Sequence, residues 1–268
     1  MKNKYNNCCK IVLLILVTAI NGHAQKLPNV QVQSVRAPAI VKIDGKPTEW
    51  GILQAYNHAT EIFYTMANDD ENLYLVVQAT DQDIINRIMG GGVTLHIQPL
   101  EKNTDNEAIS VKYPVLEKRT SVTFILNRGI VLDTTPKIAD SVMAANNKRL
   151  EQFCRWITVK GIKGLDTLSV YNEDHIKAVA AFNNRRVYTF ELSISLKQLG
   201  CSQNNRTTFS YHITLDGLKG LTTSLLIRPT DTPEMIAEGQ RLMVSVTAKT
   251  LRLSSPTDFG GKYTLALK

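Results

Sequence analysis

The chain has few cysteines, and this shortage excludes one class of exported protein. Its 268 residues contain four cysteines, two of which, Cys8 and Cys9, lie ahead of an apolar stretch near the N-terminus. The rest of the chain has Cys154 and Cys201, too few for a small scaffold held by disulfides. Either these two form one bridge or both are free thiols, because sequence separation says nothing about their geometry.

The sequence also lacks the motifs that carry cofactor or nucleophile chemistry. It has no Gly-x-Ser-x-Gly and no His-Glu-x-x-His, and its triple glycine, Gly90–Gly92, follows a helical stretch rather than opening one. The histidines never show the spacing of zinc ligands. A glycosidase would need two carboxylates at a set separation, which a sequence cannot pair. We therefore expect a protein that is not an enzyme and has no organic cofactor.

Long apolar runs are missing except near the start of the chain. Three lysines precede the apolar stretch Ile11–Ile20, and Gly22-His23-Ala24 supplies the small residues that a signal peptidase reads. The stretch is about half of the roughly 20 residues needed to cross a bilayer. These features predict a signal peptide over residues 1–24, a secreted or periplasmic product and no integral membrane span after cleavage. Cys8 and Cys9 precede the stretch, so we expect no lipid anchor.

The excess of positive charge is small and dispersed. The formal net charge is +7, and three of the lysines responsible lie in the predicted signal peptide. Basic and aromatic residues do not cluster on one stripe, which argues against a nucleic-acid partner. No Gly/Ser-rich or Pro-rich linker divides the remainder, so residues 25–268 are expected to form a single domain.

Alternation of apolar and polar residues predicts β-strands through most of the chain. It is clearest over Leu73–Thr80, Val93–Ile97, Val187–Ile194 and Phe209–Leu215, each with one apolar face. One wet face on each strand favours antiparallel sheets. Further strands are expected over Ile40–Ile43, Glu61–Met66, Ala108–Tyr113, Trp156–Lys160, Lys177–Phe182, Leu221–Ile227, Thr247–Leu253 and Lys262–Leu267.

Helical signals are few. Gln82–Met89 has isoleucines at helical spacing, and Ile138–Phe153 follows Pro136 with apolar residues at similar spacing. Both are expected to be insertions between strands. The fold class predicted is therefore all-β, an antiparallel β-sandwich with jelly-roll or immunoglobulin-like layers and short helical insertions.

Several short segments, in their order along the chain, carry a resemblance to a known family. They are Ile43-Asp44-Gly45 with Trp50, the hairpin Asp70–Tyr74, then Asp81, Val93–Ile97, Tyr188–Leu196 with Leu199, Phe209–Leu215 and Pro256–Gly260. In this order the chain resembles family 9 carbohydrate-binding modules over about residues 35–268. The resemblance implies a secreted β-sandwich that binds a polysaccharide or oligosaccharide.

The chain departs from that family where the sugar is held. The family grips a sugar between two tryptophans, whose flat faces stack on pyranose rings. The resemblance places these at Met89–Gly92 and Leu253–Ser255, and neither segment has an aromatic residue. Trp50 corresponds to a structural tryptophan of the family, for which core packing is the favoured role. Trp156 has no counterpart, and it is the candidate ligand-binding residue, with a core role as the alternative.

Calcium is a second possibility that the resemblance brings. Asp69, Asp70, Asp81 and Asp83 flank the hairpin and its exit, and oxygen-rich loops can hold this cation. The alternative is that these residues are there for tight turns and local hydrogen bonds, because Asp and Asn favour such positions.

The leading expectation is a secreted, non-catalytic binding domain for a glycan or another extracellular small molecule, with exposed aromatic residues near Trp156. The alternative is an interaction or scaffold protein of the cell envelope, with Ile138–Phe153 as the element that contacts a protein partner. An amphipathic face there supports this reading weakly, because such faces usually cover their own core. A glycoside-active enzyme is third.

Overall fold

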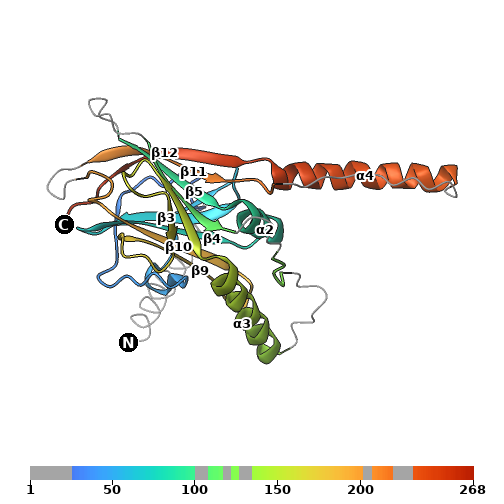
Figure 1. The fold of residues 1–268 in the computed structure, drawn as a ribbon, viewed down its shortest axis with the longest axis horizontal. Coiled ribbons are helices and arrows are strands. Elements are labelled where there is room, and N and C mark those ends of the chain that lie inside the picture. The colour runs from blue at the N-terminus through green and yellow to red at the C-terminus, as the bar shows by residue number, and fades with distance from the viewer. Residues whose placement is uncertain (1–25, 100–107, 117–121, 127–134, 202–206, 220–231) are drawn as a thin grey trace, which may run out of the picture.

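The protein is built mainly from two sheets of six strands. The computed structural model describes residues 26–99, 108–116, 122–126, 135–201, 207–219 and 232–268, so the expected signal peptide lies outside the described residues. All strand pairs in the described part are antiparallel except the pair between β1 and β3. Figure 1 shows the strands gathered in one body from which helices extend.

The first sheet has the order β1-β3-β4-β10-β9, with β2 paired to β3. Its strands are β1 (Val35–Arg36), β2 (Ala55–Asn57), β3 (Ile62–Asn68), β4 (Asn72–Ala79), β9 (Ile176–Phe182) and β10 (Tyr188–Ser195). The long central strands are rich in β-branched and aromatic residues, which favour extended backbone. Strand β9 is an edge of this sheet.

The second sheet has the order β12-β11-β5-β6-β7-β8. Its strands are β5 (Val93–Pro99), β6 (Ile109–Val115), β7 (Trp156–Lys160), β8 (Thr167–Ser169), β11 (Thr208–Leu215) and β12 (Thr257–Thr264). Residues alternate between buried and less buried along β6, β7 and β11, as expected for strands with one apolar face.

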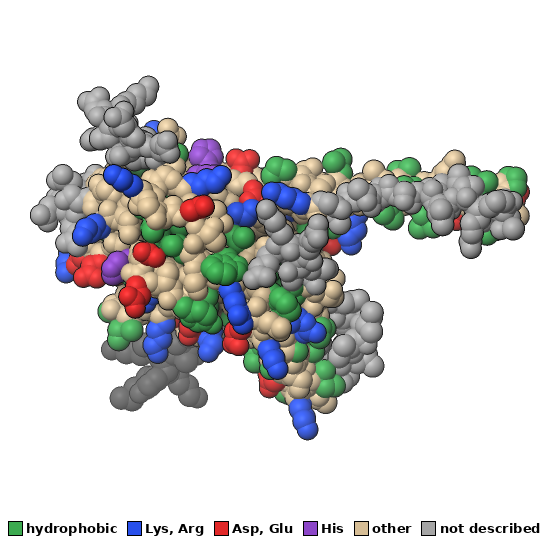
Figure 2. Space-filling model, in the orientation of Figure 1, with side chains coloured by type: hydrophobic (Ala, Val, Ile, Leu, Met, Phe, Trp, Pro, Cys, Tyr) green, Lys and Arg blue, Asp and Glu red, His purple; other side chains and the backbone are tan. Residues whose placement is uncertain are grey.

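In the described ranges, three α-helices and one short 3₁₀ helix connect the strands. The 3₁₀ helix spans Pro47–Glu49, α2 spans Gln82–Gly91, α3 spans Pro136–Phe153 and α4 spans Pro233–Ser254. Helix α4 projects from the body in Figure 1, and Figure 2 shows hydrophobic side chains spread along it. None of its residues is buried, whereas α2 and α3 each bury one face.

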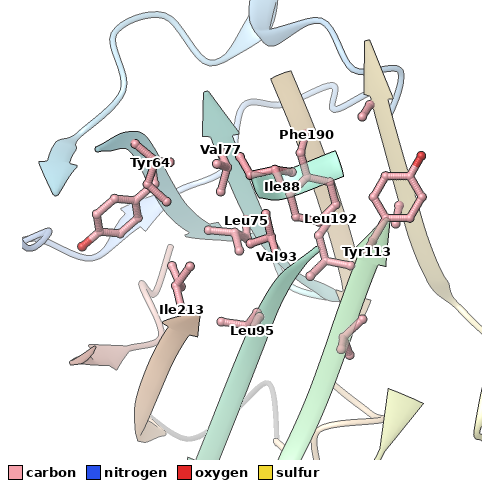
Figure 3. Close-up of a cluster of buried hydrophobic side chains, with 14 of the residues drawn as sticks. Tyr64, Leu75, Val77, Ile88, Val93, Leu95, Tyr113, Phe190, Leu192 and Ile213 are labelled. Carbon is pink, nitrogen blue, oxygen red and sulfur yellow. The ribbon is translucent and has the colours of Figure 1, made fainter. Parts of the chain in front are cut away.

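One cluster of buried side chains takes members from both sheets and from α2. Leu75 and Val77 of β4 and Phe190 of β10 belong to it, together with Leu95 of β5 and Ile88 of α2. Figure 3 shows side chains of the two sheets pointing toward one another in this cluster. The two layers therefore share one core, which buries the apolar faces predicted from the alternation. The prediction of one wet face is wrong for β4 and β10, because their opposite faces are largely buried as well.

Two consecutive asparagines attach α3 to extended backbone on either side of it. Asn147 accepts from the Phe182 N–H (2.7 Å) and donates to the Phe182 carbonyl (3.0 Å) at the edge of β9. Asn146 does the same with Ile125, at 2.9 and 3.1 Å. A primary amide offers a donor and an acceptor side by side, as a neighbouring strand does. The asparagines therefore pair with backbone groups that have no strand partner.

We predict that Asn147→Ala lowers the free energy of unfolding by about 2 kcal/mol, because both backbone groups of Phe182 lose their partner. Lys148→Ala is the matched control: Lys148 is the next residue of α3 and is exposed, so its loss should cost at most about 0.5 kcal/mol. Urea unfolding of both variants measures the difference. Equal effects would contradict the role given to Asn147.

Most of the predicted strands are confirmed, and both helices predicted from spacing are confirmed as α2 and α3. The strand predicted over Ile40–Ile43 is wrong, because this segment forms no strand ladder and belongs to a loop. The strand predicted over Thr247–Leu253 is also wrong, because these residues form the C-terminal part of α4. Strand β12 starts and ends earlier than the predicted Lys262–Leu267. Leu221–Ile227 lies outside the described residues.

Candidate functional site

The Asp44-Gly45 turn is held by a buried glutamate of β10. Glu191 is fully buried, and its carboxylate accepts from the N–H groups of Asp44 (2.9 Å) and Gly45 (2.7 Å) and from the Trp50 indole (2.8 Å). Burial raises the pKa of Glu191 to about 7, although these three donors act in the opposite direction. Trp50 also lies against Tyr74, with ring centroids 5.6 Å apart. Trp50 is therefore a structural residue that covers this carboxylate.

The two places where the resemblance puts the sugar clamp are joined through a third segment. A Cβ added at Gly91 would overlap the Asp216 carbonyl, and one added at Gly217 would overlap the Ser254 carbonyl. Residues 216–218 thus fill the space between the end of α2 and the end of α4. The Leu218 N–H also donates to the Leu253 carbonyl at 2.9 Å. The C-terminal end of α4, its root (Leu253–Ser254), therefore occupies the place where the resemblance puts the clamp.

The four aspartates considered for calcium lie in two pairs at opposite ends of β4. The eight residues of β4 between the pairs span about 26 Å. Asp69 accepts from the N–H groups of Glu71 and Asn72, both at 2.7 Å, and Asp70 pairs with Arg36 at 2.9 Å and Lys268 at 2.6 Å. The hydrogen bond from Lys268, and to a smaller extent the one from Arg36, lowers the pKa of the Asp70 carboxyl below its ordinary value.

At the other end of β4, Asp81 caps α2 by accepting from the N–H groups of Asp83 (2.9 Å) and Ile84 (3.1 Å). Asp83 pairs with Lys249 at 3.2 Å. The structure therefore does not bring the four carboxylates together. Over the described ranges of the chain, no three His, Cys, Asp or Glu side chains form a group that could hold a metal ion. Calcium binding stays a prediction.

A cavity of about 440 Å³ opens beside the edge strand β9. Its walls come from the C-terminal end of α3, from β9, from the segment between β8 and β9, and from two residues of other segments. The lining residues are Ile43, Tyr113, Leu150, Glu151, Cys154, Val170, Tyr171, Asn172 and Lys177–Ala180. The volume is within the range of small-molecule sites, which are mostly apolar with a few polar groups.

Tyr171 is an exposed aromatic ring on the wall of this cavity. Its exposed fraction is 77%, and the turn that carries it is fixed by Asn172. The Asn172 amide donates to the carbonyls of Ser169 (2.7 Å) and Ile176 (2.8 Å), while its oxygen accepts from the Asp174 N–H (2.9 Å). These bonds hold the backbone of the turn, so a ligand that stacks on the ring needs to order only the side-chain torsions of Tyr171.

Trp156 lies close in the fold to this turn but does not line the cavity. It opens β7, is half-buried, and is the cross-strand partner of Ser169, two residues before Tyr171. The expected exposed aromatic near Trp156 is therefore present as Tyr171, which sequence reasoning did not single out. The only available signal was the turn-forming sequence Asn172–His175, because exposure of the ring depends on the packing of the two sheets.

The ionisable groups that line the cavity differ in burial. Burial raises the pKa of the Cys154 thiol to about 12, so this residue is not a thiolate at neutral pH. Cys154 and Cys201 are both free. Tyr113 is buried against Phe190, with centroids 5.4 Å apart and planes nearly parallel, and its burial raises the pKa of the phenol. Glu151 and Lys177 are exposed and supply charge of both signs.

The outer face of the second sheet is polar and offers another surface. His96 of β5 is the cross-strand partner of His212 of β11, and burial, the largest cause, lowers the pKa of His96. Beside them, Asp216 accepts from Thr94 (3.0 Å) and pairs with Lys112 (2.8 Å). Thr94, Lys112 and Asp216 therefore bond to one another, and none of the five residues named on this face is Trp, Tyr or Phe.

Among the described residues that line the larger hollow near His175 and Cys201, of about 770 Å³, none is Trp, Tyr or Phe. Among these three surfaces, the cavity beside β9 alone combines apolar walls with an exposed aromatic ring.

The comparisons with known proteins supply no relative. No protein-family model matches the chain, and no curated protein sequence matches it. Within the part of the chain that the structure describes, every helix is too short or too polar to span a membrane.

Proposed function

We propose that the protein is an exported, non-catalytic binding domain with a β-sandwich of the kind found in family 9 carbohydrate-binding modules. Its ligand is a glycan or another extracellular small molecule held in the cavity beside Tyr171. The observation that carries this proposal is a largely apolar cavity of about 440 Å³ with an exposed tyrosine on its wall. Sugar rings have apolar faces that stack on such rings.

The ligand site differs from the one that the resemblance implies. The clamp positions have no aromatic residue and lie at the root of α4, whereas the cavity lies between α3 and β9. Glu151 can accept hydrogen bonds from hydroxyl groups of a ligand, and Lys177 can donate to them. In this proposal, sugar binding has moved to a different edge of the sheets.

We predict that the purified chain is retained on at least one member of a polysaccharide panel and that Tyr171→Ala weakens this binding at least about tenfold, or about 1.4 kcal/mol. Tyr171→Phe keeps the ring and should bind within about threefold of the parent. Affinity electrophoresis or a glycan array measures retention. Circular dichroism of each variant verifies that the fold is intact.

Two further variants locate the surface. His212→Ala removes an exposed side chain from the polar face of the second sheet, and Trp156→Ala removes the aromatic residue that opens β7. Retention lost in His212→Ala but kept in Tyr171→Ala would overturn the cavity in favour of the sheet face. Absence of retention across a broad panel of glycans would overturn the proposal as a whole.

A further inference from the structure

Strand β12 (Thr257–Thr264) is the longest strand at an edge of either sheet in the described part of the chain. It has eight residues, against seven in β9, three in β8 and two in β1. It is the last strand of the second sheet, where it pairs with β11. Figure 1 places β12 at the rim of the body, and α4 leads away from its N-terminal end rather than along it. One side of its backbone therefore faces no strand.

The edge of β9, by contrast, is covered at both ends by side-chain amides. Asn147 bonds to both backbone groups of Phe182, and Asn172 donates to the Ile176 carbonyl at 2.8 Å. Cover of this kind hinders the addition of a further strand. Between the described residues, no comparable bond reaches the backbone of residues 258–262 of β12. The edge of β12 is therefore open where that of β9 is closed.

The backbone groups on the open side of β12 belong to every second residue. The Leu265 N–H donates to the Thr207 carbonyl at 2.9 Å, directly beyond the ladder of β11 and β12. Residues of an antiparallel ladder alternate between bonding to their neighbour and facing away from it. The N–H and carbonyl groups of Asp258, Gly260 and Lys262 therefore point to the open side. Asp258 and Lys262 are exposed and Gly260 is partly exposed, so another strand can reach them.

The charges on β12 are arranged symmetrically about Gly260. Asp258 lies two residues before this glycine and Lys262 two residues after it, and both side chains lie on the outer face of the sheet. When two copies of β12 pair antiparallel about a two-fold axis at Gly260, Asp258 of each copy lies directly opposite Lys262 of the other. Opposite charges in facing positions stabilise a pair of strands.

Neighbouring two-fold registers lack this match. An axis at Asp258 or at Lys262 would place two like charges directly opposite each other. An axis at Phe259 or at Gly261 would place each of the charged residues opposite an uncharged one. The charge pattern therefore fits one register, and it fits a second copy of the same strand.

The charged side chains of β12 are available for such a contact. The His212 ring lies 3.7 Å from the Asp258 carboxylate, which is beyond hydrogen-bonding distance, and both side chains are 61% exposed. The same ring lies over Gly260 and leaves no room there for a Cβ. The glycine is thus needed within each copy, so a test of the edge has to change the charges and keep the glycine.

We propose that the open edge of β12 pairs with β12 of a second copy of this chain, antiparallel about a two-fold axis at Gly260. The second sheets of the two copies then continue as one sheet, and the interface uses the same patch on both molecules. Asp258, Gly260 and Lys262 of each copy form its hydrogen-bonded pairs. If the charges instead keep the edges of two copies apart, as charged residues do on many edge strands, the chain stays monomeric.

The first test is sedimentation velocity of the full purified chain between about 1 and 100 µM, where a small interface should associate. We expect a dimer whose share rises across this range. Asp258→Lys and Lys262→Asp should each weaken association about tenfold or more, because each places like charges opposite each other at two contacts.

Lys160→Asp is the matched control for Lys262→Asp. Lys160 is an exposed residue of β7 in the same sheet, and β11, β5 and β6 separate it from β12. Its reversal changes the net charge equally and should leave the dimer intact. A monomer at every concentration would overturn the proposal, and so would equal effects of Lys160→Asp and Lys262→Asp.

The second test fixes the register by exchange of charge. An equimolar mixture of Asp258→Lys chains with Lys262→Asp chains again has opposite charges at both contacts and should form a heterodimer about as tight as the parent dimer. A chain that carries both substitutions should also dimerise, because its exchanged charges still face each other. Failure of either to associate would overturn the axis at Gly260. Circular dichroism verifies that each variant is folded.

Hydrogen exchange separates pairing through β12 from a dimer formed elsewhere. The Gly260 N–H faces the open side, so its exchange should slow as the concentration rises through the range of dimerisation. The Gly261 N–H bonds to β11 and should be protected at every concentration. Exchange at Gly260 that does not depend on concentration would overturn the proposal even for a chain that dimerises. Retention on glycans is measured separately and involves no residue of β12, so this proposal and the proposed function fail independently.

Discussion

Replacement of Glu191 by alanine is expected to cost about 4 kcal/mol of unfolding free energy at about pH 5, since three donors lose their acceptor in a buried place. The donors are the N–H groups of Asp44 and Gly45 and the indole of Trp50. Gly45 cannot compensate by moving, since an added Cβ there would already touch the backbone of Ala180 and Ala181, and its φ is +77°.

The same variant tests the charge of Glu191. The pKa of this residue is about 7 in the folded protein against an ordinary value of 4.5, so the folded chain holds the proton to higher pH than the unfolded chain. The stability that Glu191 contributes is therefore fully present below about pH 4.5 and falls by about 3 kcal/mol as the pH rises through about 7.

The cost of Glu191→Ala should accordingly shrink by about 3 kcal/mol between about pH 5 and pH 8. Urea unfolding of the parent and the variant across this range measures it. Ser193→Ala, two residues along the same face of β10, is the control, and its cost should not depend on pH. If the cost of Glu191→Ala grew with pH instead, the three hydrogen-bond donors would affect the pKa of Glu191 more than burial does. That result would contradict the raised pKa.

Substitution of Gly217 by alanine is expected to detach the root of α4. The added Cβ would overlap the carbonyl oxygen of Ser254, which is backbone and can move only with the end of the helix. We expect a loss of about 3 kcal/mol of stability from this overpacking. The hydrogen bond from the Leu218 N–H to the Leu253 carbonyl, 2.9 Å long, should break with it.

Hydrogen exchange at Leu218, combined with thermal unfolding, reports both effects of Gly217→Ala. Gly200→Ala is the comparison, because Gly200 has a φ of +67° but no atom within 4 Å of an added Cβ. Its cost should be about 1 kcal/mol, from backbone conformation alone. If Gly217→Ala costs no more than this and leaves Leu218 protected, the close contact at the root does not hold α4.

Much of the two-sheet core could be predicted from alternation alone, because strands that bury one face must repeat every two residues. Leu73–Thr80 and Phe209–Leu215 follow that rule and are β4 and β11. Ile40–Ile43 was also predicted to be a strand but has no neighbouring strand. Its Lys42 N–H donates to the Glu49 side chain, and the Asp44-Gly45 turn that follows it is held by Glu191, far along the chain. Strand formation needs a partner, which local sequence does not contain.

The strand predicted over Thr247–Leu253 is the last part of α4, although Leu251 and Leu253 are two residues apart, as on one face of a strand. The better signal lay at the start of the helix, where Thr232 caps it by accepting from the Met235 N–H at 3.3 Å and Pro233 occupies the first turn. The candidate cavity was harder to foresee. Its walls come from α3, β9 and Ile43, and Tyr171 is presented by hydrogen bonds of Asn172 that sequence spacing does not show.

The asparagine contacts of α3 bear on how the chain avoids association during synthesis. An uncovered edge strand is a template on which another molecule can add its own strand. Helix α3 ends at Phe153 and leaves the ribosome before β9, which starts at Ile176. The amide of Asn147 is therefore already available when the β9 edge emerges. Nascent chains that carry Asn147→Ala would expose that edge to one another, and aggregation in the cell would then exceed what the loss of equilibrium stability alone explains.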